Sequence, residues 1–107
     1  MKVLRLACLI TLMPAIACAA EGEALISIKD HRFSPEEVRV PANRKIKLIV
    51  HNQDSTPEEF ESHELNREKV IPGNSKATVW IGPLAPGRYP FFGEFNEKTA
   101  RGAVIAE

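Results

Sequence analysis

Apolar and polar residues alternate along several short stretches of this chain, and turn-forming residues separate these stretches. Alternation places every second side chain on the same face, which is typical of a half-buried β-strand. The separating segments, "NQDSTP", "IPGN" and "GPLAPG", are rich in residues that preset or tolerate turn dihedrals. The pattern predicts strands at residues 24–29, 37–40, 45–52, 76–81, 88–94 and 102–107.

Many short strands with frequent turns predict an all-β fold in which two sheets pack face to face as a β-sandwich. Pro90 cannot donate to a strand ladder, so it predicts a sheet edge or a bulge at its position. Residues 62–70, "SHELNREKV", have helical leanings but are too few to form a stable helix alone. We expect a loop with a helical turn there.

The first twenty residues differ from the rest. Lys2 and Arg5 precede the apolar run "VLRLACLITLMPAIA", and "ACAA" supplies small residues for cleavage. This is the pattern of a secretory signal peptide, so we expect residues 1–20 to be removed and residues 21–107 to form one periplasmic domain. An alternative stays open: "AIAC" resembles a lipobox, in which Cys18 would carry a lipid.

Removal of residues 1–20 changes two counts. Of 14 basic residues, two lie in this segment, so 12 basic and 14 acidic residues remain, with a net charge of −2. No basic stripe appears along the sequence, and we expect no nucleic-acid partner. The segment also holds both cysteines and both methionines, so residues 21–107 contain no thiol and no thioether.

The order of these features resembles the cupredoxin family over nearly the whole of residues 21–107. "FSPEEVRVPANRKIKLIVHNQD" is similar to the family's opening, "LAPGRYPFF" to the strand before its copper-binding Cys, and "TARGAVI" to the segment after its Met. The resemblance implies a cupredoxin-like Greek-key sandwich. "IKDHRF", "NQDSTPEEFESHELNREKV" and "FFGEFN" further resemble the cupredoxin-like domains of bacterial high-affinity iron uptake, of the EfeO-like type.

The resemblance also implies where copper ligands would lie, and none of the four is present. Glu58 occupies the place of the first His, Gly93 that of the Cys, Asn96 that of the second His and Ala100 that of the Met. A type 1 copper site needs a thiolate and two imidazoles. We therefore expect no type 1 copper and no blue-copper electron transfer.

Other metal ligands remain available. Glu58 shares its parity with Phe60, so we expect it to point inward at the mouth of the sandwich, where Glu94 lies in a facing loop. Carboxylates suit hard metal ions, and these two residues are the first candidates. Glu59, Glu61 and His63 have the opposite parity and form a second candidate set if the strand continues, and His31 is a further candidate. Each of these residues is also compatible with a solvated surface.

Two functions stay open at this point. The resemblance implies a periplasmic accessory protein that binds, oxidises or delivers iron or copper for a ferrous-iron permease, alongside a second periplasmic metal-binding protein. Oxidation would need an electron acceptor that the sequence does not visibly supply. The alternative is a metal-free cupredoxin-fold module that docks onto a partner protein. In either case we expect contact with the membrane only through a partner or a lipid on Cys18.

Overall fold

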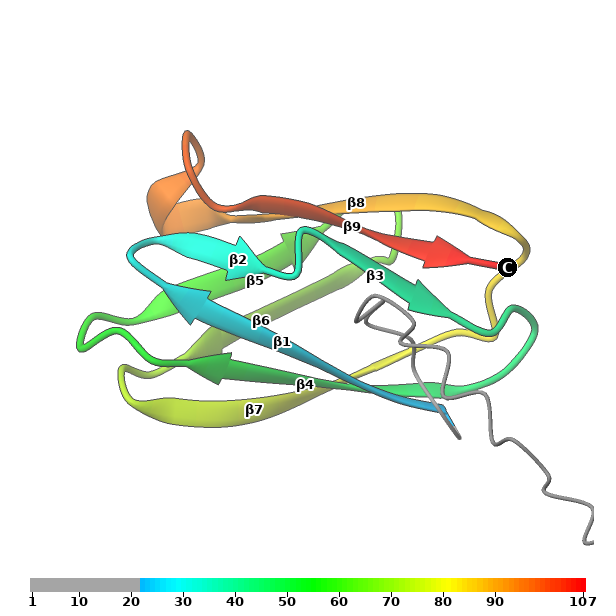
Figure 1. Cartoon of the computed structure of the whole chain (residues 1–107), viewed down its shortest axis with the longest axis horizontal. Helices are drawn as coiled ribbons and strands as arrows, with labels where there is room; N and C mark the ends of the chain where they lie inside the picture. The colour runs from blue at the N-terminus through cyan, green and yellow to red at the C-terminus, as the bar shows by residue number, and fades with distance from the viewer. Residues whose placement is uncertain (1–21) are drawn as a thin grey trace, which may run out of the picture.

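A computed structural model describes residues 22–107, which form two β-sheets packed face to face (Figure 1). The signal-peptide prediction and Cys18 lie outside the described residues. The strands are β1 (Glu23–Lys29), β2 (Arg32–Ser34), β3 (Glu37–Val40), β4 (Ile46–Asn52), β5 (Glu58–Ser62), β6 (Arg67–Ile71), β7 (Ser75–Ile81), β8 (Gly87–Gly93) and β9 (Arg101–Ala106). One turn of 3-10 helix, η2 (Glu94–Asn96), follows β8. Over residues 22–107, no helix has the length and apolarity needed to cross a membrane.

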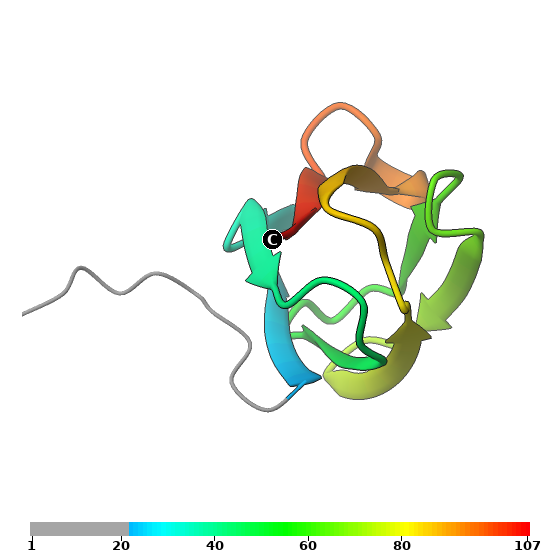
Figure 2. The same cartoon turned by 90° about the vertical axis from the view of Figure 1, so that its right-hand side faces the viewer.

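The two sheets exchange strands along the chain, as expected for a Greek-key sandwich. One sheet has the order β2-β1-β4-β7 and the other the order β3-β9-β8-β5-β6. Strands β1 and β4 run parallel, as do β3 and β9, and the remaining pairs are antiparallel. Viewed along the strands, the two sheets curve around a single interior (Figure 2). The predicted all-β sandwich is confirmed.

The core consists of the residues that the alternation placed inward. The apolar side chains of β1 and β4 on this face are fully buried: Ile26, Ile28, Ile46, Leu48 and Val50. Three phenylalanine rings from β2, β5 and β8 fill the interior near one end of the sandwich, with centroids 4.9–6.3 Å apart: Phe33, Phe60 and Phe91. Edge-to-face and tilted contacts of this kind stabilise a core beyond the area that the rings bury.

The prediction for residues 62–70 is wrong in its second half. His63 to Asn66 form a turn, closed by a hydrogen bond of 3.1 Å from the Asn66 N–H to the His63 carbonyl oxygen. The chain then continues as β6, which pairs with all of β5. Pairing satisfies the backbone groups of β6 that face β5, and this outweighs a weak helical propensity. Strand β2 was also not predicted, because three residues carry no readable alternation.

Pro90 lies at a local edge, as predicted. Strand β8 pairs with β9 from Gly87 to Phe92, but with β5 only at Phe92 and Gly93. At Pro90 the ladder on the β5 side has ended, so the missing N–H removes no hydrogen bond from it. The Ser62 hydroxyl donates to the Pro90 carbonyl oxygen at 2.7 Å and links the two strands there.

Candidate metal centre

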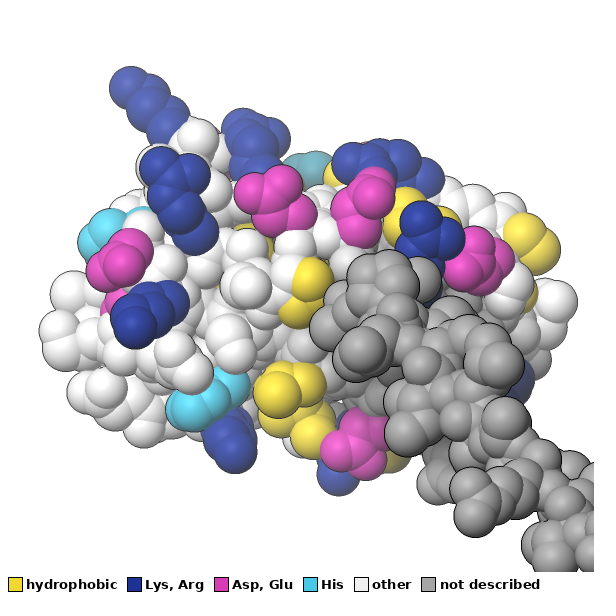
Figure 3. All heavy atoms as spheres, viewed as in Figure 1, with side chains coloured by type: hydrophobic (Ala, Val, Ile, Leu, Met, Phe, Trp, Pro, Cys, Tyr) yellow, Lys and Arg dark blue, Asp and Glu magenta, His cyan; other side chains and the backbone are white. Residues whose placement is uncertain are grey.

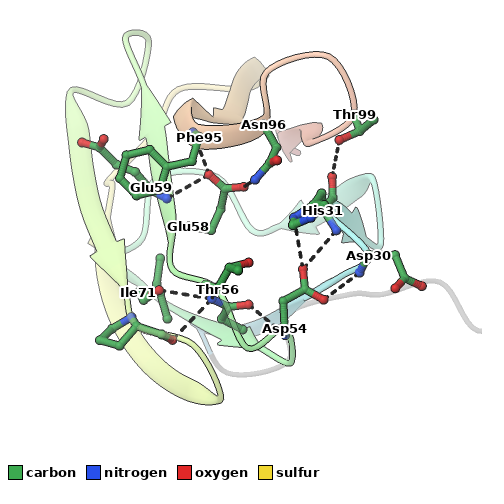
Figure 4. Close-up of polar contacts among 12 residues, drawn as sticks. Asp30, His31, Asp54, Thr56, Glu58, Glu59, Ile71, Phe95, Asn96 and Thr99 are labelled. Atoms are coloured by element: carbon green, nitrogen blue, oxygen red, sulfur yellow. Dashed lines mark hydrogen bonds and ion pairs between the residues drawn. The ribbon is translucent and has the colours of Figure 1, made fainter.

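Glu58 begins β5 and is buried, with 1% of its surface exposed. Its carboxylate accepts three hydrogen bonds: Oε1 from the backbone N–H groups of Glu59 at 3.0 Å and Phe95 at 2.9 Å, and Oε2 from the Asn96 side-chain amide at 2.6 Å (Figure 4). Hydrogen bonds to a charged acceptor are the strong ones, and together they compensate the desolvation of this carboxylate. The inward direction predicted for Glu58 is confirmed, and its oxygens are already occupied.

The Glu58 carboxylate also fills the space beside Gly93. A Cβ atom at Gly93 would lie 2.6 Å from Glu58 Cδ, 2.8 Å from Glu58 Oε2 and 2.7 Å from the Ala100 Cβ. Ala100 is fully buried, and its backbone oxygen accepts from the Gly93 N–H at 2.9 Å. At the position that the resemblance assigns to the copper-binding Cys, this chain therefore has no room for a side chain.

A second group of carboxylates gathers on the outer face of the same sheet. Glu59 and Glu61 alternate with Glu58 and Phe60 on β5, and their side chains project outward, as Figure 4 shows for Glu59. One carboxylate oxygen each from Glu59, Glu61 and Glu94 lies within 4.8 Å of the others. Glu94 reaches this face because η2 turns the chain immediately after β8. The expected partnership of Glu94 with Glu58 is therefore replaced by one with Glu59 and Glu61.

Glu68 adds a fourth carboxyl group, and we call Glu59, Glu61, Glu68 and Glu94 the carboxylate cluster. Strand pairing places Glu68 directly opposite Glu61. The sequence-based candidates omitted Glu68, because residues 62–70 were expected to form a loop. The signal that would have found it is the strand "REKVI", whose pairing with β5 fixes which side chains are neighbours.

The cluster concentrates negative charge, and no ion pair of the described residues neutralises it. Along residues 22–107, the ion pairs are His31–Asp54, Arg39–Glu107 and Arg88–Glu37, and none of them involves a cluster residue. Glu59 is 8% exposed, and Oε2 of Glu61 is buried without a hydrogen-bond partner. A buried carboxylate oxygen without a donor is costly, so this geometry is suited to a positively charged ligand.

The raised pKa values of Glu59 and Glu61 reflect the same repulsion among the carboxylates. A side-chain hydrogen bond with Glu68, which exists only while one of the two carboxyls is protonated, raises the pKa of Glu59 from 4.5 to about 7. Burial and the charge of Glu94 act in the same direction. A proton shared with the Glu94 carboxyl, which two ionised carboxylates cannot provide, and then burial likewise raise the pKa of Glu61.

His63 lies beside the cluster. Its ring is 5.7 Å from the ring of Phe92, the residue of β8 that pairs with Glu61. A surface hollow of about 190 Å³ is lined by Glu61, His63 and Glu68, together with Ser62, Asn66 and Arg67. The second candidate set from the sequence, Glu59, Glu61 and His63, is thus brought to one region of the molecule.

His31 lies elsewhere, in the turn between β1 and β2. The Asp54 carboxylate accepts from the backbone N–H groups of Asp30 at 2.8 Å and His31 at 3.0 Å, and the hydroxyl of Thr99 donates to the His31 carbonyl oxygen at 2.6 Å (Figure 4). These bonds, that of His31 first, hold the pKa of Asp54 below its usual value. His31 lines a hollow that also includes Glu94 and Phe95, and it is absent from the group of converging ligand atoms.

Comparison with known proteins agrees with this architecture. The model of the cupredoxin-like domain family matches residues 2–106, so the chain belongs to the cupredoxin-like domain family. A protein of Rickettsia prowazekii (strain Madrid E), described as uncharacterized, is 49% identical over 83 residues, which are 78% of this chain and 66% of that protein. The match thus spans just under two thirds of the relative's length.

Solved structures with the same fold include copper proteins. The metal-binding domain of the Cu(I)-exporting P-type ATPase CopA of Streptococcus pneumoniae D39 has a TM-score of 0.75 at 16% identity, covering 89% of this chain and 98% of that one. Auracyanin A, a "blue" copper protein of Chloroflexus aurantiacus, has a TM-score of 0.68 at 12% identity, covering 79% and 98%. Amicyanin of Paracoccus versutus has a TM-score of 0.62 at 18% identity, covering 89% and 85%. Identities this low show a shared fold.

Proposed function

We propose that this protein binds a hard metal ion, iron or copper(II), at the carboxylate cluster on the outer face of β5, β6 and η2. The observation that carries this proposal is the convergence of Glu59, Glu61 and Glu94 around a buried oxygen of Glu61 that has no hydrogen-bond partner. A cation placed there would satisfy that oxygen and remove the repulsion among the carboxylates. The satisfied oxygen and the reduced repulsion would both favour metal binding.

The spacing of the ligand atoms supports a single ion. Two oxygens bound to one small divalent cation at about 2.1 Å lie at most about 4.2 Å apart. The converging oxygens of Glu59, Glu61 and Glu94 lie within 4.8 Å of one another, so small side-chain rotations are enough to close the site. Glu94 and Glu68 are exposed, so their side chains are free to make these rotations. Glu59 is buried, and its side chain has less freedom to rotate.

A histidine ligand beside the carboxylates would favour iron or copper(II) over magnesium, calcium and manganese. Carboxylates alone suit magnesium, calcium and manganese, whereas imidazole extends the preference to iron, copper and zinc. His63 is not among the converging ligand atoms, but it lines the same hollow as Glu61 and Glu68, and a rotation of its side chain would add a nitrogen ligand that biases the site in this way. Thiolate-selective binding of Cu(I) is not part of the proposal, since residues 22–107 contain no cysteine.

Iron uptake is the cellular role that we propose for this site. Its support is the resemblance to EfeO-like domains together with a carboxylate-rich site, which favours Fe(III) over Fe(II) because it carries more negative charge than imidazole. The protein would act in the periplasm, receiving or oxidising ferrous iron beside a permease and a second metal-binding protein. An oxidising role requires that a partner accept the electron.

Glu58 has a different part in this proposal. Its carboxylate already accepts from Glu59, Phe95 and Asn96 and occupies the space beside Gly93. We infer that it substitutes for a metal at the former type 1 position and keeps that end of the sandwich closed. The same observation favours the alternative function, a metal-free docking module, if the carboxylate cluster binds no ion. Direct binding of a metal ion by Glu58 stays an untested prediction, and the occupied carboxylate oxygens do not favour it.

Calorimetric titration tests the proposal. The secreted protein, with its N-terminus established by mass, would be titrated with Fe(II) under argon, with Cu(II) and with Mg²⁺. We expect binding of one Fe(II), stronger than that of Mg²⁺, and an affinity at least about tenfold lower in Glu61→Gln, because the variant loses a charged ligand. His63→Gln should reduce the preference for Fe(II) over Mg²⁺.

Two control variants make the test specific. Glu64→Gln removes the same charge from an exposed turn residue three positions along, and it should leave the affinity unchanged. Glu58→Gln should lower the stability of the fold, because an amide cannot accept all three hydrogen bonds, and it should leave the affinity nearly unchanged. Equal affinities in wild type and Glu61→Gln would refute the cluster as the site, and no binding by wild type would favour the metal-free module.

A further inference from the structure

The outer face of the other sheet has the opposite electrostatic character. Strands β2, β1, β4 and β7 present apolar side chains surrounded by basic ones, and we call this surface the basic face. Its apolar residues are Leu25, Ile49 and Trp80, and its basic residues are Lys29, Arg32, Lys45, Lys47 and Lys76. Figure 3 shows part of it, where hydrophobic side chains are exposed over β1 and β4 beside a histidine.

Strand register makes the apolar residues of the basic face neighbours. Leu25 lies directly opposite Ile49, and Trp80 lies opposite Lys47, one diagonal step from Ile49. Leu25 is 53% exposed and Trp80 is 48% exposed. The Lys45 ammonium lies 4.7 Å from the centre of the Trp80 ring, so an indole and a cation are presented together.

The charge of this face is strongly one-sided. Residues 22–107 contain 12 basic side chains (14 − 2), and five of them belong to the basic face. Among the outward-facing positions of its four strands, Glu23 is the one acidic residue. The outward-facing positions of the four strands therefore carry four basic residues against one acidic residue, a net charge of +3 (4 − 1), and Lys45 just before β4 adds a fifth basic side chain on a domain whose overall charge is slightly negative.

We infer that the basic face lies on an anionic lipid bilayer, with Trp80 and Leu25 at the level of the headgroups and the lysines above lipid phosphates. Tryptophan and lysine are the side chains that favour this interface, because each has an apolar body and a polar end. Each basic residue near an anionic surface adds to the attraction. The contact is direct, and so differs from the partner-mediated or lipid-mediated contact expected from the sequence.

The position of the chain's entry supports a bilayer as the occupant. The domain begins at Gly22, where a Cβ atom would lie 3.0 Å from the Lys45 backbone oxygen and 3.9 Å from the Arg44 side chain. In the alternative in which Cys18 carries a lipid, that lipid would be joined to the chain four residues before Gly22, which lies at the border of the basic face.

Trp80 allows a direct test, because it is the single tryptophan of the chain. The secreted protein would be mixed with vesicles of phosphatidylcholine alone or with a quarter phosphatidylglycerol, and its fluorescence recorded at low and high salt. We expect a blue shift of Trp80 emission and co-sedimentation only with the anionic vesicles, both reduced by salt. Lys47→Glu combined with Lys76→Glu should lower the partition coefficient at least about tenfold.

The matched control reverses the charge of two lysines that lie outside the basic face. Lys69→Glu combined with Lys98→Glu changes two exposed lysines outside the basic face, and it should bind vesicles nearly as wild type does. Leu25→Ser should weaken binding several-fold without changing charge. The proposal is overturned if anionic vesicles leave Trp80 emission and sedimentation unchanged, or if both double variants lose binding equally. Binding of an acidic protein without any vesicle binding also overturns it.

Discussion

At the scale of single residues, the end of the sandwich is defined by Glu58 and Gly93. Alternation along residues 58–62 was enough to predict that Glu58 and Phe60 point inward. The partners of Glu58 could not be predicted, because the Phe95 N–H and the Asn96 amide are positioned by a 3-10 turn that the sequence pattern does not reveal. Glu58 lies where the resemblance places a copper ligand, but both of its carboxylate oxygens already accept hydrogen bonds.

Gly93→Ala tests this close packing. The added methyl group would meet the Glu58 carboxylate and Ala100, so we expect a loss of about 1–3 kcal/mol in the free energy of unfolding, measured by urea denaturation. In a Glu58→Ala background the carboxylate is gone, and the same Gly93→Ala change should cost at least about 1 kcal/mol less. Simple additivity of the two substitutions would show that the carboxylate does not fill this space.

At the scale of elements, the pair β5 and β6 determines the cluster. The sequence revealed Glu59 and Glu61 through their parity, but Glu68 became a neighbour only through the register of a strand that was expected to be a loop. Glu94 joined through η2. The alternation places Lys45 and Lys47 on the outer face of one strand, but the whole basic face could not be predicted, because four strands assemble it. The alternation of apolar and polar residues therefore predicts which face a side chain lies on, and the strand register determines which side chains are its neighbours.

The β5–β6 pair should make stability depend on pH in the metal-free protein. The pKa of Glu59 is raised from 4.5 to about 7 in the folded state, so the folded protein binds a proton more tightly than the unfolded chain. Stability is then greatest below about pH 4.5 with respect to this group, and it falls as the pH rises through 7. Glu59→Gln should flatten this dependence, as measured by urea denaturation across that range. A wild-type stability that rises between pH 5 and pH 7 in step with the variant would contradict the assignment.

At the scale of the whole molecule, the chain keeps a cupredoxin fold while it carries an acidic cluster on the outer face of one sheet and a basic face on the other. The carboxylate cluster lies on one sheet and the basic face on the other. With the basic face on a bilayer, the cluster would be directed away from the lipid and remain accessible to soluble partners. The sequence predicted the fold well, because the fold rests on alternation and turns. It predicted the surfaces poorly, because they depend on the arrangement of both sheets.

Copper(II) provides a test at the same scale. Secreted protein whose mass shows that residues 1–19 are absent should develop no intense blue band when Cu(II) is added, because that absorption requires a thiolate ligand. Weak nitrogen and oxygen coordination is the expected spectrum. An intense blue band in such a sample would contradict the alignment of Gly93 with the copper-binding Cys.

The most direct test of the central claim is to locate the ion. Crystals grown with Fe(II) under argon, and measured at the iron absorption edge, would give an anomalous difference map that marks each bound iron. The account predicts one strong peak within bonding distance of carboxylate oxygens from Glu59, Glu61 and Glu94, with the hydrogen bonds of Glu58 intact. A peak between Glu58 and Gly93, or no peak at the cluster under conditions in which titration shows saturation, would contradict it.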